Sequence, residues 1–85
     1  MTASTHLKIY VTQIGLHETI VAVASQRAAI EALGIEANAF ARGHAHDVRD
    51  REGAYAIALE QPGRVFARPA GSDKPFKPVR DAAHE

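Results

Sequence analysis

The residues best suited to chemistry in this chain are two histidines near its middle. The segment His44-Ala45-His46-Asp47 places two imidazoles two positions apart, with a carboxylate directly after them. On an extended strand, residues two apart point to the same side, so both imidazoles would face one zinc or nickel ion. Zinc sites use three or four ligands, and only two protein ligands are visible here. His44 and His46 are therefore candidate metal ligands, and two exposed histidines in a polar loop are the simpler interpretation.

Arginines form the second candidate site. Every cation between residues 42 and 68 is an arginine, and guanidinium groups suit bidentate contacts with phosphate. These arginines would form one surface if the segments 42–51 and 64–68 lie side by side. Acidic neighbours such as Asp47 and Glu60 can pair with them, so a solvated, salt-linked surface is the simpler interpretation. The candidate binding residues, which include one aromatic side chain, are Arg42, Arg49, Arg51, Arg64, Phe66 and Arg68.

The remaining composition argues against catalysis. The chain has no cysteine, which excludes disulfides and thiolate zinc sites, and it has neither a G-x-S-x-G nucleophile motif nor a glycine-rich phosphate loop. Ten Lys and Arg balance ten Asp and Glu, so no overall field draws the protein to nucleic acid or to an anionic membrane. The sequence therefore predicts a protein that is not an enzyme, with no catalytic residue and no cofactor.

The element that organises the chain is a short helix over residues 25–34. Ser25 has the side-chain oxygen of an N-cap, and Gly34 can adopt the left-handed conformation that ends a helix. Its apolar side, with Ile30 and Leu33 as the largest groups, must pack on something else. We expect the helix to pack on a sheet, because residues with strand patterns directly precede it.

Two strands are predicted before this helix. Leu7, Ile9 and Val11 alternate with more polar residues, which is the period-two pattern of a strand over 6–12. Residues 19–24 are apolar on both faces, as in a central strand. The short connection 13–17, which contains Gly15, predicts an antiparallel hairpin.

The sequence after the helix predicts a helical turn, then permits a short strand, and then fits two alternative structures. Residues 38–43 predict one helical turn that places Phe40 in the core, and residues 43–49 permit a short strand in which positions 44, 46 and 48 share a face. Residues 50–61 fit two periods: a strand in which Tyr55 and Leu59 share a face, or a helix that Asp50 caps. We favour the helix, because alanines are depleted in strands and Pro62 is a natural stop.

Residues 64–68 predict a closing strand at a sheet edge, and three prolines after it predict a flexible tail. A second copy would pair with this edge, unless the tail folds back over it with Phe76 as anchor. The expected organisation is a disordered N-terminus over 1–5, a single domain over 6–68 and a flexible tail over 69–85. The expected fold is α+β, a small, mostly antiparallel sheet in the order β-β-α-short β-α-β, with two helices on one face.

The layout of Gly34, the turn around Phe40, Gln-Pro-Gly at 61–63 and Arg-Pro-Ala-Gly-Ser at 68–72 resembles short uncharacterised proteins of α-proteobacterial genomes and plasmids. The resemblance covers residues 7 to about 76. It implies a bacterial protein, and because its motifs are glycines and prolines that shape a fold, it implies no activity and no site.

These patterns together lead us to expect a small accessory or interaction module that binds a protein partner, or a second copy of itself, through a sheet face or edge. A nucleic-acid-associated regulator using the arginines is the second hypothesis. A metal-binding protein or enzyme using His44 and His46 is the third. No window approaches the roughly 18 apolar residues of a membrane span, and no signal-peptide pattern is visible, so we expect no membrane association and a cytoplasmic location.

Overall fold

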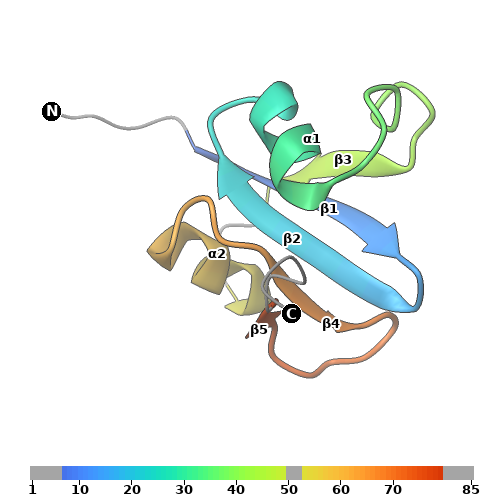
Figure 1. Cartoon of the computed structure of the whole chain (residues 1–85). Helices are drawn as coiled ribbons and strands as arrows, with labels where there is room; N and C mark the ends of the chain where they lie inside the picture. Colours follow the sequence, from blue (N-terminus) through green and yellow to red (C-terminus); the bar gives the residue numbers. More distant parts are fainter. Residues whose placement is uncertain (1–6, 50–52, 80–85) are drawn as a thin grey trace, which may run out of the picture.

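The computed structural model describes residues 7–49 and 53–79, so the predictions for residues 1–5, for Arg51 and for a helix cap at Asp50 lie outside it. The described residues form one antiparallel five-stranded sheet in the order β3-β1-β2-β4-β5, with short helices (Figure 1). This is the small α+β fold that the sequence predicts. The elements are β1 (Lys8–Ile14), β2 (His17–Val23), α1 (Gln26–Leu33), β3 (Ala45–Val48), the 3-10 helix η1 (Gly53–Tyr55), α2 (Ala56–Glu60), β4 (Phe66–Pro69) and β5 (Lys77–Pro78).

The β1–β2 hairpin at the centre of the sheet confirms the predicted one. Ile14 pairs with His17 across a tight turn, and Gly15 has the positive φ of 61° that such a turn favours. Strand β1 runs two residues beyond the predicted strand, because Gln13 and Ile14 continue the ladder although both are exposed. The hairpin therefore projects past the core at its turn.

The two helices lie on opposite faces of the sheet, so the prediction that both cover one face is wrong. On one face, Ile20 belongs to a core cluster with Ala58 of α2; on the other, Val21 belongs to a cluster with Ala29 and Leu33 of α1. Successive residues of a strand point to opposite faces, and a strand that is apolar on both sides needs a cover on each. We call these faces the α2 face and the α1 face.

Helix α1 begins and ends as predicted. The Ser25 hydroxyl accepts a hydrogen bond from the backbone N–H of Ala28 at 3.1 Å, and Gly34 takes the left-handed conformation with φ 69°. The N–H groups of Gly34 and Ile35 both donate to the carbonyl of Ile30, at 2.9 and 3.2 Å. These bonds satisfy backbone groups that a helix end leaves without partners.

The chain between α1 and β3 also follows the prediction. The Arg42 N–H donates to the Asn38 carbonyl at 3.0 Å, which closes one helical turn. The Phe40 ring packs edge-on against Tyr10 on the α1 face, with centroids 5.3 Å apart. Strand β3 then pairs with β1, as Val11 opposite His46 shows.

Residues 53–60 are helical, which confirms the favoured interpretation of this segment. Ala58 is fully buried on the α2 face. Its small side chain lets the short helix approach the sheet closely. The helix ends at Glu60, two residues before Pro62.

Residues 69–79 are folded, so the prediction of a flexible tail from residue 69 is wrong for this part of it. Strand β5 pairs with β4, placing Pro78 opposite Phe66, and the Val79 N–H donates to the Val65 carbonyl at 2.8 Å. Phe76 is only 3% exposed and belongs to the core of the α2 face. The alternative in which Phe76 anchors the returning chain is confirmed, and β4 is not an edge strand.

Candidate functional site

The two candidate metal ligands face one pocket. His44, directly before β3, and His46, within it, are both exposed and line a pocket of about 400 Å³ on the α2 face, together with Glu18 and Tyr55. Within residues 7–49 and 53–79, no group of three or more His, Cys, Asp or Glu side chains is placed to hold a metal ion. The structure thus brings the two imidazoles to one side of the sheet without adding a third ligand.

The candidate arginines are divided by the sheet. Strand β3, which lies between Arg42 and Arg49 in the chain, is at one edge, whereas β4, which follows Arg64, lies beyond the β1–β2 hairpin. With about 4.8 Å between neighbouring strands, β3 and β4 are about 14 Å apart. The two segments do not lie side by side, which was the condition for a phosphate-binding surface. Phe66 is fully buried, so this candidate is not available to a partner.

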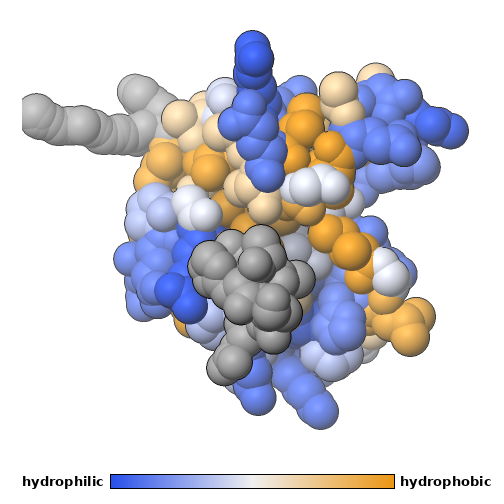
Figure 2. Space-filling view, viewed as in Figure 1, coloured by the Kyte–Doolittle hydropathy of each residue, from blue (hydrophilic) through white to orange (hydrophobic). Residues whose placement is uncertain are grey.

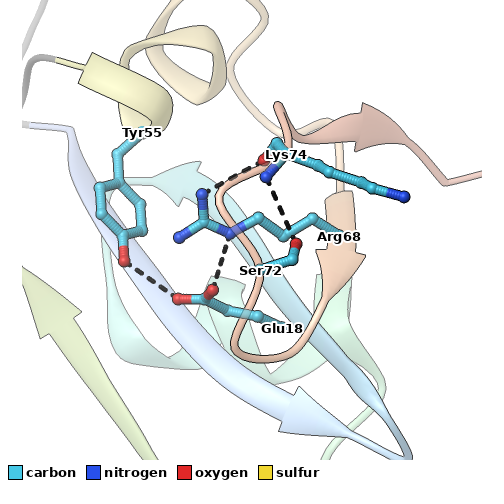
Figure 3. Close-up of polar contacts among 5 residues, drawn as sticks. All are labelled: Glu18, Tyr55, Arg68, Ser72 and Lys74. Carbon is cyan, nitrogen blue, oxygen red and sulfur yellow. Dashed lines mark hydrogen bonds and ion pairs between the residues drawn. The ribbon is translucent and has the colours of Figure 1, made fainter.

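Arg68 belongs to a partly buried polar network rather than to a free surface (Figure 3). Its Nε donates to Oε1 of Glu18 at 2.9 Å, and the Tyr55 hydroxyl donates to Oε2 of the same carboxylate at 3.0 Å. Its Nη1 donates to the Lys74 carbonyl at 3.3 Å, and its guanidinium carbon lies 4.3 Å from the centre of the Phe76 ring. We call Glu18, Tyr55, Arg68 and Phe76 the latch.

The latch has a structural role. Both carboxylate oxygens of Glu18 are hydrogen-bonded, and the Glu18 and Arg68 side chains are only 23% and 13% exposed. The four residues join β2, η1, β4 and the segment before β5. Each oxygen of the Glu18 carboxylate thus has one hydrogen-bond partner within the latch.

The α1 face carries a larger hollow, which we call the α1 groove. It has a volume of about 770 Å³ and lies where α1, which packs on β2, leaves part of the sheet uncovered towards β4. Glu31 and His17 are polar residues of its lining. Most of the lining is apolar or small, and includes Thr19, Ala32, Leu33, Val65, Ala67 and Val79.

Two of the three large apolar side chains that are exposed in the described residues line this groove. Ile14 and Val79 line it and are 43% and 42% exposed. Leu16, at the tip of the hairpin turn and next to the groove residue His17, is 81% exposed. Figure 2 shows hydrophobic surface that extends along the hairpin towards its turn. Such a concentration of exposed apolar groups marks an interaction site.

Thr19 adds a polar group to the groove. Its cross-strand neighbour Thr12 donates its hydroxyl to the His44 carbonyl at 2.8 Å. The Thr19 side chain, in a residue only 4% exposed, has no such bond within the described part of the chain. A buried hydroxyl without a partner costs about 1–3 kcal/mol. An occupant with one polar atom beside its apolar group would therefore gain from contact with Thr19.

Neither Leu16 nor the groove belongs to the predicted sites. A signal for Leu16 exists in the sequence, because an apolar residue directly after the turn glycine Gly15 has no strand neighbour to cover it. The groove has no local signal. It depends on how far α1 reaches across the sheet, which is a property of tertiary packing.

Comparisons of the chain with protein-family models, with curated proteins and with solved structures give no match. The resemblance to α-proteobacterial proteins stays a prediction. In the described ranges, no helix has the length and hydropathy needed to cross a membrane.

Proposed function

We propose that this protein is a small non-enzymatic interaction module that binds a protein partner through the α1 groove. The observation that supports the proposal is the position of three exposed apolar side chains: Ile14 and Val79 line one apolar groove, and Leu16 directly precedes its lining residue His17 in the chain. Covering apolar surface contributes about 25 cal/mol per Å² removed from water, so a partner that covers all three gains binding free energy.

The shape of this surface favours a protein over a small molecule. Ligand pockets enclose most of a small ligand and hold it with a few convergent polar groups. The α1 groove instead adjoins the hairpin turn, because its lining residues Ile14 and His17 flank that turn, and Leu16 within the turn is 81% exposed. A partner must therefore fill the groove and also cover the projecting Leu16. This requires a larger contact surface than a small molecule has.

The charges favour a protein over nucleic acid. The described residues that line the groove include Glu31 and His17 but neither Lys nor Arg. Nucleic-acid binding relies on cations that contact phosphate, and the described part of the groove lining supplies none. The cytoplasmic location expected from the sequence stays a prediction.

Photo-crosslinking tests this proposal. A photoreactive residue replaces Glu31, an exposed groove residue, in the full chain, and proteins captured in the source cells are identified by mass spectrometry. We expect a captured protein that persists after nuclease treatment and is lost with Ile14→Ser/Leu16→Ser. The control Lys8→Ser, which changes an exposed residue of the same strand outside the groove lining, should retain it. Capture that Ile14→Ser/Leu16→Ser leaves unchanged, or that nuclease abolishes, would contradict the proposal.

A further inference from the structure

We infer that the protein partner is a second copy of this chain, with Leu16 of each copy seated in the α1 groove of the other. The inference rests on the proposed function, because it uses the same groove. Leu16 directly precedes the groove residue His17 in the chain, so its backbone lies next to the groove lining. A two-fold axis beside them places each projection in the opposite hollow, which is the self-complementary arrangement of a two-fold dimer.

The projecting turn is held in place before it docks. The Ile14–His17 pair closes the ladder, and the Ala70 N–H donates to the Leu16 carbonyl at 2.9 Å. A side chain on a fixed backbone loses less conformational freedom on binding than one on a free loop. Leu16 is therefore a preorganised anchor.

The groove matches the chemistry of this anchor. Leu33, Val65 and Ala67 supply an aliphatic lining for the leucine side chain. The turn that carries Leu16 also brings backbone N–H and C=O groups into the groove. One of these satisfies the Thr19 hydroxyl, which is buried without a hydrogen bond in the described residues.

Electrostatics permit this association. The formal net charge of the chain is zero, so two copies do not repel each other as a whole. When Leu16 enters the groove of the partner copy, the adjacent His17 enters with it. The groove contains Glu31, whose carboxylate accepts a hydrogen bond from an imidazole N–H.

The segment 80–85, which follows the groove residue Val79, is the other occupant within this chain. Its sequence is Arg-Asp-Ala-Ala-His-Glu, in which the apolar residues are two alanines. It has no large apolar side chain to place in the groove. A second copy supplies one, Leu16, which is why we choose it.

The first measurement is the mass in solution of the full chain by light scattering, from tens to hundreds of micromolar. We expect the mass to rise from 9.1 kDa towards twice that value. Leu16→Lys changes the anchor, and Ala32→Glu changes the groove. Each should weaken the dimer at least about tenfold, because Leu16→Lys loses the apolar contact with the aliphatic lining and Ala32→Glu places a second carboxylate beside Glu31 in the groove. Lys8→Ser, on the same hairpin but outside the groove lining, should dimerise like the natural chain.

The second measurement mixes the two weakened variants after their thermal unfolding shows that both are folded. In the mixed dimer, the lysine introduced at position 16 of one copy meets the glutamate introduced at position 32 of the other. The remaining Leu16 enters an unchanged groove. We therefore expect the mixture to regain the two-chain mass that neither variant reaches alone. An additional interface elsewhere would not show this recovery.

Three results would overturn the inference. They are a natural chain that stays at one-chain mass throughout, a dimer that Leu16→Lys does not weaken, and a Glu31 crosslink that maps to residues 80–85 of the same chain. If the natural chain is monomeric but the Glu31 probe captures a different protein in a groove-dependent manner, self-association fails and the proposed function stands. If no protein is captured in that manner, the proposed function fails as well.

Discussion

The charged side chain of Arg68 is largely shielded from water. The side chain is 13% exposed, and its guanidinium group lies over the Phe76 ring. A cation in such a place needs a partner that offsets its lost hydration, and Glu18 is that partner. The charge state of Glu18 therefore affects how firmly the chain around Phe76 is held.

Glu18→Gln tests this dependence. The substitution keeps the shape of the side chain but removes the negative charge that faces Arg68, so we expect a loss of about 1–3 kcal/mol in the free energy of unfolding. Urea unfolding measures it. The matched control is Glu31→Gln, which removes the exposed Arg27–Glu31 pair, whose atoms are 3.8 Å apart, and should cost at most about 0.5 kcal/mol. Equal effects of the two substitutions would contradict the role of the latch.

Tyr10 is the second residue whose environment changes its chemistry. It is 4% exposed, and burial raises the pKa of its hydroxyl above the ordinary value of 10.0, with the Asp47 carboxylate as a further cause. Asp47 lies opposite Tyr10 in the β1–β3 ladder. The folded protein thus holds this proton more tightly than the unfolded chain does.

The sign of the resulting pH dependence is fixed by linkage. Below about pH 10 both states keep the proton and the stability is at its full value, whereas above it the unfolded chain loses the proton first and stability falls. We expect Tyr10→Phe to remove this part of the alkaline decline. Urea unfolding at about pH 9 and about pH 11 compares the two proteins on either side of the ordinary tyrosine pKa. The same decline in both would show that Tyr10 does not contribute.

At the scale of elements, α1 depends on one large side chain for its contact with the sheet. Leu33 is 7% exposed and lies in the cluster of the α1 face with Val21 and Val23. Leu33→Ala should lower the free energy of unfolding by about 2–5 kcal/mol, from lost burial and the cavity that remains. Thermal and urea unfolding measure this loss. An unchanged denaturation midpoint would mean that α1 does not help to hold the sheet.

The elements that the sequence predicts well are those with local signals. Ser25 and Gly34 fix both ends of α1 through their own side chain and backbone, and Gly15 fixes the hairpin turn. The alanines around Ala58 favour a helix by intrinsic propensity. Such signals act within a few residues, so they can be recognised in the sequence without knowledge of the fold.

The elements that the sequence predicts poorly depend on contacts between distant segments. The strand β5 exists because Phe76 finds a place on the α2 face beside Tyr55, 5.5 Å between ring centres. The sequence of residues 69–79 alone does not indicate this packing position on the α2 face. The apolar residues on both sides of β2 partly indicate that α1 and α2 cover opposite faces of the sheet. No sequence pattern indicates the α1 groove, so the candidate site was not predictable.

At the scale of the whole molecule, β5 completes the sheet by covering β4. Phe76→Ala should cost about 3–5 kcal/mol and release β5, which would turn β4 into an unprotected edge. Hydrogen exchange at the β4 amides should then become faster than exchange in the β1–β2 hairpin. The control Asp73→Ala, at an exposed position of the same segment, should change stability by less than about 0.5 kcal/mol. Unchanged exchange in β4 after Phe76→Ala would contradict this function of β5.

The latch also has a kinetic consequence. Glu18 and Arg68 are 50 positions apart, whereas β1 and β2 meet across a tight turn. Local contacts form before distant ones, because distant contacts require a larger loop to close. We therefore expect the latch to form after the folding transition state, so that Glu18→Gln leaves the refolding rate nearly unchanged. A loss of about 2 kcal/mol would then appear as roughly thirtyfold faster unfolding. In a stopped-flow experiment, the latch would set the lifetime of the folded state and leave the speed of reaching it unaffected.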